Sequence, residues 1–199
     1  MKICLDPGHS GKIEPGACSG GVTEAVINLE VAKIAGRMLE KFGHKVLLTR
    51  TGEVDNYWLS WRCEAAWAFG ADIFVSIHCN ASNDESAKGT ETFYFPGSET
   101  GHALARCIQS ELVALCHTVD RNVKTNDEWT VLLETAMPAV LVELAFLTNE
   151  AERAKLTSDM GQRQFAEGLV RGINRFADGG PLFGKVMESP ASYGVSSAG

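Results

Sequence analysis

The chain has 199 residues, which is enough for one sizeable hydrophobic core, and its formal net charge of −7 argues against nucleic acid or an anionic membrane surface as a partner. No run of about 18 uncharged apolar residues occurs, so no membrane span is predicted. The chain opens with a strand pattern and lacks the basic, apolar and small-residue order of a signal peptide.

The six cysteines include no C-x-x-C pair, which disfavours a zinc knuckle. Several of them lie on faces that are predicted to be buried. Cysteines that act as small apolar residues in a reducing compartment fit this distribution better than a disulfide framework does. We therefore expect free thiols.

Strands and helices alternate along the chain. The first strand, over residues 2–5, ends where Asp6-Pro7-Gly8 interrupts the ladder, because proline lacks a backbone donor and glycine permits positive φ. A glycine-rich loop over residues 10–23 leads to a helix over 24–41 with one apolar stripe, made by Ile27, Val31, Ile34, Met38 and Phe42. Further strands are predicted over 46–49, 72–77, 91–95, 129–133 and 139–142, and further helices over 57–69, 98–116, 150–156 and 160–176.

Strands that are almost continuously apolar are typical of a sheet that is covered on both faces. With the alternation of strands and helices, they predict an α/β fold of a single domain: a twisted, mostly parallel sheet of about six strands with helices on both faces. We expect this domain to span residues 1–177. Half of the residues from 178 to 199 are Gly, Pro or Ser, so that segment is predicted to be a flexible tail or linker.

Four polar side chains are predicted to meet at one edge of this sheet. His9 follows the first strand, Glu24 opens the next helix, His78 follows the strand over 72–77, and Glu143 closes the last strand. The carboxyl ends of parallel strands lie together, and ligands bind in the crevice outside them. Two imidazoles and one carboxylate are typical of catalytic zinc with an open coordination position, and the second glutamate would supply the base.

Each of these residues also has a simpler structural interpretation. Glu24 would favour the positive end of the helix dipole. His78 could hydrogen-bond a backbone carbonyl, and Glu143 could form an ion pair with Arg50 or Arg121. The convergence of all four residues on one edge is what favours a functional site.

The sequence also resembles a known family. Motifs similar to those of the zinc-dependent N-acetylmuramoyl-L-alanine amidases of the amidase 3 type occur in the family's order between residues 2 and 177: Leu5-Asp6-Pro7-Gly8-His9-Ser10-Gly11, Glu24 with Asn28-Leu29, Leu48-Thr49-Arg50, Phe74-Val75-Ser76-Ile77-His78-Cys79-Asn80-Ala81 and Met137-Pro138-Ala139-Val140-Leu141-Val142-Glu143. The resemblance implies a six-stranded sheet, one Zn²⁺ per chain held by His9, Glu24 and His78, and Glu143 as the catalytic glutamate.

What the resemblance implies about function is hydrolysis of the amide bond between N-acetylmuramic acid and L-alanine in bacterial peptidoglycan, as in autolysins and endolysins. The alternatives are a zinc-dependent polysaccharide deacetylase and an inactive cell-wall binding module. Peptidoglycan would be the partner, and the chain would act as a monomer. It would work on the extracytoplasmic cell wall, reached by lysis or through a secretion signal that is missing from this chain.

One departure from the family pattern lies at Arg121-Asn122-Val123-Lys124, where the family has Arg-Gly-Val-Lys. Asparagine tolerates left-handed backbone angles, so we expect the turn to survive. Some family members carry an inserted helix that covers the zinc. Here only residues 125–128 separate this turn from the next predicted strand, so we expect an open site.

Three residues are candidates for contact with the substrate. Trp129 is the preferred one, Arg121 is another, and Asn80 would either bind substrate or orient His78. Trp58 and Trp61 could stack on sugar, but aromatic residues at helical positions are usually part of a core.

The remaining reactive side chains are expected to have structural roles. Cys79 adjoins His78, but successive strand residues point to opposite faces, so it is expected to pack in the core. His44, His102 and His117 lie at surface turns or on a helix and are expected to be solvated.

Overall fold

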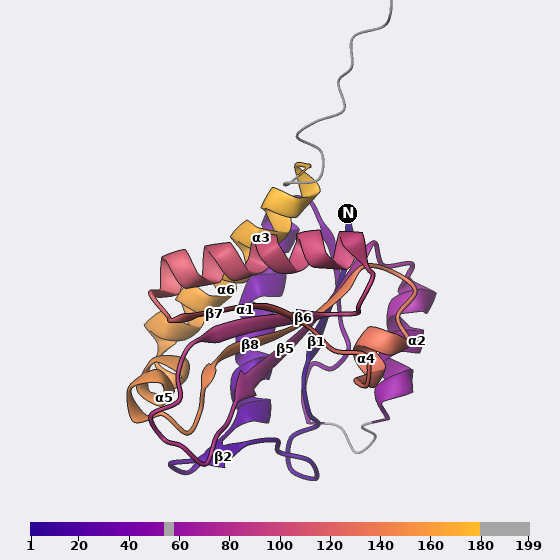
Figure 1. Cartoon of the computed structure of the whole chain (residues 1–199). Helices are drawn as coiled ribbons and strands as arrows, with labels where there is room; N and C mark the ends of the chain where they lie inside the picture. The colour runs from indigo at the N-terminus through magenta and orange to yellow at the C-terminus, as the bar shows by residue number, and fades with distance from the viewer. Residues whose placement is uncertain (54–57, 180–199) are drawn as a thin grey trace, which may run out of the picture.

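The fold is built on one twisted six-stranded sheet, seen in a computed structural model that describes residues 1–53 and 58–179 (Figure 1). In spatial order its strands are β4 (Lys45–Leu48), β1 (Lys2–Pro7), β5 (Ile73–Asn80), β8 (Ala139–Phe146), β6 (Thr90–Tyr94) and β7 (Asp120–Thr125). All neighbours are parallel except β6 and β8, which are antiparallel. The predicted α/β fold with a mostly parallel sheet is confirmed.

Helices cover the two faces of the sheet unequally (Figure 1). On one face lie three long helices, α1 (Glu24–Lys41), α3 (Glu99–Cys116) and α6 (Asp159–Ala177), with α5 (Glu150–Thr157) beside α6. On the other face lie only α2 (Leu59–Phe69) and the four-residue α4 (Thr130–Leu133), which contact each other. The smaller cover leaves part of the second face open.

Alternation along β5 shows how the strands serve both faces. Ile73, Val75 and Ile77 are fully buried under the long helices, whereas Phe74 packs toward α2 and α4. Period-two geometry then places Ser76 and His78 on the same face as Phe74. This is the face that the two short helices cover incompletely.

Several local signals agree with the observed helix boundaries. The helix predicted over 24–41 is α1, and its chain reverses through Gly43, which has φ +84°. The side chain of Ser98 caps α3 by accepting a hydrogen bond from the Gly101 amide at 3.1 Å, and Ser158 caps α6 in the same way through Gly161. The helix predicted over 57–69 begins at Leu59 in the described part of the chain.

One predicted strand was wrong, and one observed strand was not predicted. Residues 129–133 form no strand; Trp129 is the N-cap of α4, because a short apolar run does not distinguish a helical turn from a strand. The sixth strand is instead β7, which we did not predict. Its sequence, Asp120-Arg121-Asn122-Val123-Lys124-Thr125, is polar, as suits a strand at the edge of a sheet.

The other predictions on organisation have mixed outcomes. The loop over 10–23 contains a small antiparallel hairpin, β2 (Cys18–Ser19) and β3 (Val22–Thr23), whose two-residue turn, Gly20-Gly21, has positive φ at both positions.

All six cysteines are free thiols, as expected. The described residues contain no helix with the length and apolarity needed to cross a membrane. The tail predicted over 178–199 lies, from residue 180 onward, outside the described residues.

Candidate active site

His9 is presented by a turn with unusual backbone geometry. Its φ is +64°, one of only a few positive values at non-glycine residues in the described chain. A Cβ on Gly8 would lie 2.2 Å from Cε1 of the His78 ring, so the turn approaches that ring as closely as only glycine allows. The turn therefore places the two imidazoles side by side, with ring centroids 4.9 Å apart.

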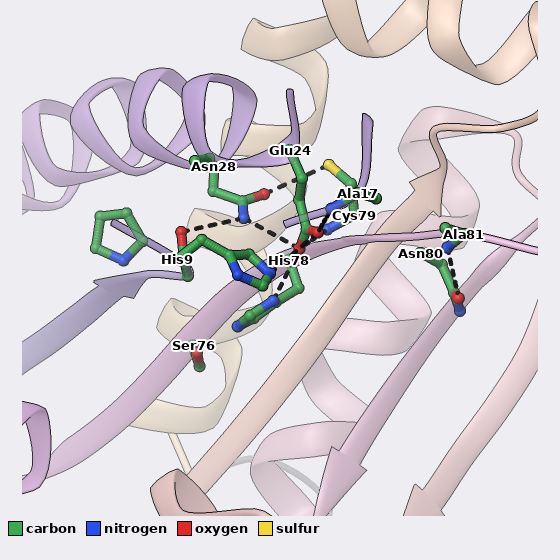
Figure 2. Close-up of polar contacts among 12 residues, drawn as sticks. His9, Ala17, Glu24, Asn28, Ser76, His78, Cys79, Asn80 and Ala81 are labelled. Carbon is green, nitrogen blue, oxygen red and sulfur yellow. Dashed lines mark hydrogen bonds and ion pairs between the residues drawn. The ribbon is translucent and has the colours of Figure 1, made fainter. Parts of the chain in front are cut away.

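Glu24 lies between the two histidines, at the first position of α1 (Figure 2). Its Oε1 is 2.8 Å from His78 Nδ1 and accepts a hydrogen bond from the Cys79 amide at 3.0 Å. Its Oε2 is 3.0 Å from His9 Nε2 and accepts a hydrogen bond from the Ala17 amide at 2.9 Å. The carboxylate is thus fixed by backbone donors while both oxygens face an imidazole.

Charge interactions in this cluster oppose the effect of burial. Burial by itself would raise the pKa of Glu24, but hydrogen bonds and charges from His78 and His9 outweigh it and hold the pKa far below its usual range. Burial by itself would lower the pKa of His9, but Glu24 and Glu14 raise it. Each group therefore stabilises the charged form of its neighbour.

The cluster is suited to hold a metal ion. One ligand atom from each of His9, Glu24 and His78 lies within 4.8 Å of the others. The second ring nitrogen of His9, Nδ1, is hydrogen-bonded to Glu14, a carboxylate–histidine pairing that is typical of metal ligands. A Cβ on Gly16 would lie 2.4 Å from the His9 ring and 2.5 Å from Glu24 Oε2, so glycine is needed to leave room for this arrangement. The donor set is that of a three-ligand catalytic zinc site.

Glu143 lies on the next strand, opposite His78 in the register of β5 and β8. Its Oε2 is buried and has no hydrogen-bond partner among the described residues. Burial raises the pKa of Glu143 to about 7, and the neighbouring Glu24 and Glu91 add to the rise while His78 opposes it. A buried carboxylate oxygen without a partner among the described residues, beside a cluster suited to hold a metal ion, is suited to contact a reacting molecule.

The sequence placed His78 and Glu143 just beyond their strands, and that detail was wrong. β5 continues to Asn80 and β8 to Phe146, so both side chains project from the face of the sheet near its carboxyl edge. The pairing of β5 and β8 continues through His78 and Glu143. No helix covers this part of the sheet face, so polar side chains are tolerated at these two positions. The pairing of Glu143 with Arg50 or Arg121 does not occur: Arg50 donates to backbone carbonyls and Arg121 to Glu91.

A buried polar network supports the turn, and sequence reasoning gave it no role in the site. Asp6 accepts hydrogen bonds from Thr49, Ser76 and Arg62, and Arg62 also donates to the Pro7 and His9 carbonyls at 2.9 and 2.6 Å. Arg62 and these charge-assisted bonds hold the pKa of the buried Asp6 below its usual range against the effect of burial. The signal that could have found this network is a polar residue inside an apolar strand, such as Asp6 or Ser76.

Arg50 extends this support to the helix. It donates hydrogen bonds to the Pro7 and Gly8 carbonyls, both at 2.9 Å, and to the Ala25 carbonyl at 2.7 Å. One guanidinium thereby connects the turn that carries His9 to the first turn of α1, which carries Glu24.

The site opens into a cavity of about 420 Å³ on the incompletely covered face. Its lining brings together His9, His78 and Glu143 with Asp6, Gly8, Glu14, Leu59, Arg62, Glu128, Trp129, Thr130, Val131 and Leu141. No helix lies between β7 and Trp129, in agreement with the expected open site.

Comparison with known proteins agrees with this geometry. The family described as N-acetylmuramoyl-L-alanine amidase matches residues 3–175. The chain belongs to this family. It is 36% identical to N-acetylmuramoyl-L-alanine amidase LytC of Bacillus subtilis (strain 168), over 85% of this chain and 34% of LytC. It is also 36% identical to N-acetylmuramoyl-L-alanine amidase CwlM of Bacillus licheniformis, over 88% of this chain and 68% of CwlM.

Solved structures of such amidases share the fold. The structure of N-acetylmuramoyl-L-alanine amidase from Clostridium difficile 630 is similar with a TM-score of 0.83 at 35% identity, covering 89% of this chain and 97% of that one. The catalytic domain of CwlV from Bacillus (Paenibacillus) polymyxa var. colistinus gives a TM-score of 0.82 at 31% identity, covering 89% and 98%. The chain is therefore an amidase of this family whose described part corresponds to a catalytic domain.

The candidate substrate contacts of this amidase differ in position. Trp129 lines the cavity, with its ring edge-on to Phe93 at 4.7 Å between centroids. Asn80 and Arg121 are absent from the cavity lining and both donate to the buried Glu91, at 2.7 and 2.9 Å.

Two expectations for the amidase's tryptophans were wrong. Trp58 and Trp61 are not core residues, because 73% and 44% of their surfaces are exposed. Trp58 is the N-cap of α2 and Trp61 lies in its first turn, and the short apolar pattern of this helix did not reveal that both are exposed.

The other reactive side chains have the following positions. Cys79 is buried under α1, as expected, and its thiol donates to Asn28. His117 is exposed, whereas His44 bonds Asn174 and His102 stacks on Tyr94, so these two are only partly solvated.

Proposed function

We propose that this amidase hydrolyses the amide bond between N-acetylmuramic acid and L-alanine in bacterial peptidoglycan, with one Zn²⁺ held by His9, Glu24 and His78. The observation that supports this most directly is the shared cavity of two of these ligands and of Glu143, whose Oε2 has no partner among the described residues. When bound, zinc would supply a Lewis acid that polarises the scissile carbonyl and makes water a stronger acid.

Glu143 is the residue that we assign to proton transfer. Its carboxylate takes a proton from the attacking water as the C–O bond forms, and returns it to the nitrogen of L-alanine as the C–N bond breaks. Burial raises its pKa to about 7 in the absence of metal, and a cation at the neighbouring cluster would lower it and so favour the carboxylate form that accepts the proton. The products are the free lactyl carboxylate and the amino terminus of the stem peptide.

Among the remaining candidates, we assign Trp129 to substrate contact because it lines the cavity. Arg121 and Lys124 both pair with Glu91, and about 36% and 41% of their side chains are exposed. Two cations on one carboxylate leave a net positive charge, so we assign Arg121 to the carboxylates of the stem peptide. Asn80 holds Glu91 in place through its amide.

The remaining proposals follow from this substrate. The chain acts on the cell wall outside the membrane, and peptidoglycan is its partner. We propose that it acts as a monomer; one chain supplies all four proposed catalytic and ligand residues, so the site needs no residue from a second copy.

The test compares amine release from purified peptidoglycan by the wild type and by Glu143→Gln, each with its zinc content measured. We expect about one zinc in both proteins, new L-alanine amino termini from the wild type, and a loss of about 10²- to 10⁴-fold in the variant. Glu40→Gln, at an exposed position of α1, is the matched control and should keep full activity. Release of acetate, with the new amino groups on the sugars and not on L-alanine, would support a deacetylase, and zinc-loaded wild type that forms no new amino group would support a binding module.

A further inference from the structure

Two cations share one buried carboxylate next to the active site. Glu91 is only 5% exposed, and its Oε2 accepts hydrogen bonds from Arg121 Nε at 2.9 Å and from Lys124 Nζ. Its Oε1 accepts a hydrogen bond from the Asn80 amide at 2.7 Å. We call Arg121 and Lys124 the β7 cation pair. Because one carboxylate cannot neutralise both cations, the group keeps a net positive charge.

A bulge in β7 brings the two cations to one face of the sheet. The register of β6 with β7 shifts between Thr90 and Thr92, where β7 contains one extra residue. At the bulge Asn122 has φ +68°, a conformation that asparagine tolerates. In a regular strand, residues three apart would point to opposite faces. The extra residue therefore allows Arg121 and Lys124 to reach the same carboxylate.

One row across the sheet connects the β7 cation pair to the active site. Glu91 lies directly opposite Glu143 in the antiparallel register of β6 and β8, and Glu143 lies opposite His78 in the parallel register of β8 and β5. Directly opposed residues of an antiparallel pair have side chains on the same face. Neighbouring strands are about 4.8 Å apart, so β7 is about 10 Å from β8. The cations reach back to Glu91, which places them about 5 to 10 Å from Glu143.

Aromatic contacts place the same pair beside the cavity wall. Lys124 Nζ lies 5.8 Å from the centroid of the Phe93 ring, and that ring packs edge-on against Trp129, which lines the cavity. The guanidinium of Arg121 lies 4.9 Å from the centroid of the Phe146 ring. Each cation is therefore held both by Glu91 and by an aromatic ring.

Arg121 keeps hydrogen-bond donors for a ligand. Its Nε is bonded to Glu91, whereas its two terminal nitrogens have no hydrogen-bond partner among the described residues. A guanidinium offers parallel N–H groups that match the two oxygens of a carboxylate. Here its orientation is already fixed by Glu91 and by the Phe146 ring, and Lys124 adds a second positive charge. The arrangement is suited to receive a carboxylate.

We propose that the β7 cation pair binds the free carboxylate of the second residue of the stem peptide, so that this amidase prefers stems in which that carboxylate is not amidated. The inference rests on the proposed function and deepens it by naming the class of stem peptide. An extended chain advances about 3.5 Å per residue, so the second residue lies about 7 Å from the scissile amide. This reach agrees with the separation of Glu143 from the pair. The carboxyl terminus of a stem of three or more residues lies beyond about 10 Å.

The first test measures binding while cleavage is suppressed. Zinc-loaded Glu143→Gln protein is titrated calorimetrically with three N-acetylmuramoyl tripeptides: one with both carboxylates free, one amidated at the second residue, and one amidated only at the carboxyl terminus. We expect amidation of the second residue to weaken binding about tenfold and amidation of the terminus to weaken it less than about twofold. High salt should reduce the tenfold preference, because it screens exposed charges. Equal binding of all three, or dependence on the terminal carboxylate, would overturn the inference.

The second test assigns the preference to the β7 cation pair by kinetics. In the wild type, kcat/KM for the tripeptide with free carboxylates should exceed that for the one amidated at the second residue about tenfold. Arg121→Gln/Lys124→Gln should reduce this ratio to about twofold or less, and Arg121→Lys, which keeps the charge but not the paired N–H groups, should give an intermediate ratio. Arg163→Gln, at an exposed position of α6, is the matched control and should keep the full ratio.

The outcomes separate this inference from the proposed function. A wild type that cleaves both tripeptides equally well would overturn the inference and leave the proposed function intact, and this comparison needs no variant. A full ratio in the double variant, with melting curves that verify folding, would also overturn it. A zinc-loaded protein that shows the binding preference but releases no amine would contradict the proposed function alone.

Discussion

His9 keeps its positive φ because buried donors hold the carbonyls around it. Arg62 donates to the His9 and Pro7 carbonyls, and Arg50 donates to those of Pro7 and Gly8. A non-glycine residue in this conformation costs of order 1 to 3 kcal/mol, which the surrounding contacts must offset. The position of His9, the first proposed metal ligand, is thus set by residues that are not themselves proposed ligands.

Arg62→Met tests this support. The substitution leaves Asp6 as an uncompensated buried carboxylate, so we expect a loss of about 3 to 5 kcal/mol in the free energy of unfolding, measured with urea. Zinc affinity should fall as well, because the His9 carbonyl loses its donor. Arg171→Met removes an exposed pair with Glu167 and should cost no more than about 0.5 kcal/mol. Equal losses for both variants would contradict a supporting role for Arg62.

The raised pKa of Glu143 predicts that the stability of the metal-free protein depends on pH. Its pKa is raised to about 7, so the folded state binds its proton more tightly than the unfolded state does. The stability that this proton contributes is fully present below a pH of about 4.5 and is lost as the pH rises through about 7.

Metal-free Glu143→Gln should avoid this loss. We expect its melting temperature to match that of the wild type near pH 4.5 and to exceed it above pH 7, in calorimetric scans with chelator present. A constant difference between the two proteins across this range would mean that Glu143 titrates normally.

At the scale of elements, the site depends on how closely three helices pack on one face. α3 and α6 approach each other through glycines: a Cβ on Gly172 would lie 2.5 Å from the Ile108 Cα, and one on Gly168 would lie 2.8 Å from Leu112. α1 contacts α6, so the backbone position of α1, which carries Glu24, depends on this contact. Such close packing of helices is not required on the opposite face, where α2 and α4 leave room for substrate.

Gly172→Ala should therefore destabilise the protein although alanine favours helices. The added methyl meets backbone of α3 and cannot be relieved by a side-chain rotation, so we expect a loss of about 1 to 3 kcal/mol in chemical denaturation. Arg163→Ala, at an exposed position of the same helix, should change the stability by no more than about 0.5 kcal/mol. A stabilised Gly172→Ala would show that α3 and α6 can separate at little cost.

At the scale of the whole molecule, the three proposed metal ligands connect distant parts of the chain. His9 follows β1, Glu24 opens α1 and His78 belongs to β5, so a bound ion would join two strands and a helix. A ligand that binds only the folded state stabilises it by mass action.

Zinc should accordingly raise the melting temperature of the metal-free protein. We expect a shift of about 5 °C or more at a zinc concentration of about 100 times the dissociation constant, reversed by a chelator. His78→Ala should abolish the shift, whereas His117→Ala, at an exposed helix C-cap, should preserve it. An unchanged melting temperature of the wild type with zinc would contradict the proposed metal site, whatever the activity.

The sequence by itself determined the α/β class, the helix α1, and the candidate set of His9, Glu24, His78 and Glu143, because periodicity, strand-breaking residues and motifs can be read directly from the sequence. It did not determine β7, whose polar residues lack a strand pattern, or the helical turn at α4, whose apolar run is too short to classify. Only the tertiary structure decided how Asp6, Arg50 and Arg62 hold the turn and which tryptophans reach the cavity. Those contacts join segments that are 40 or more residues apart, and their pairing depends on strand order and on the incomplete cover of one face of the sheet.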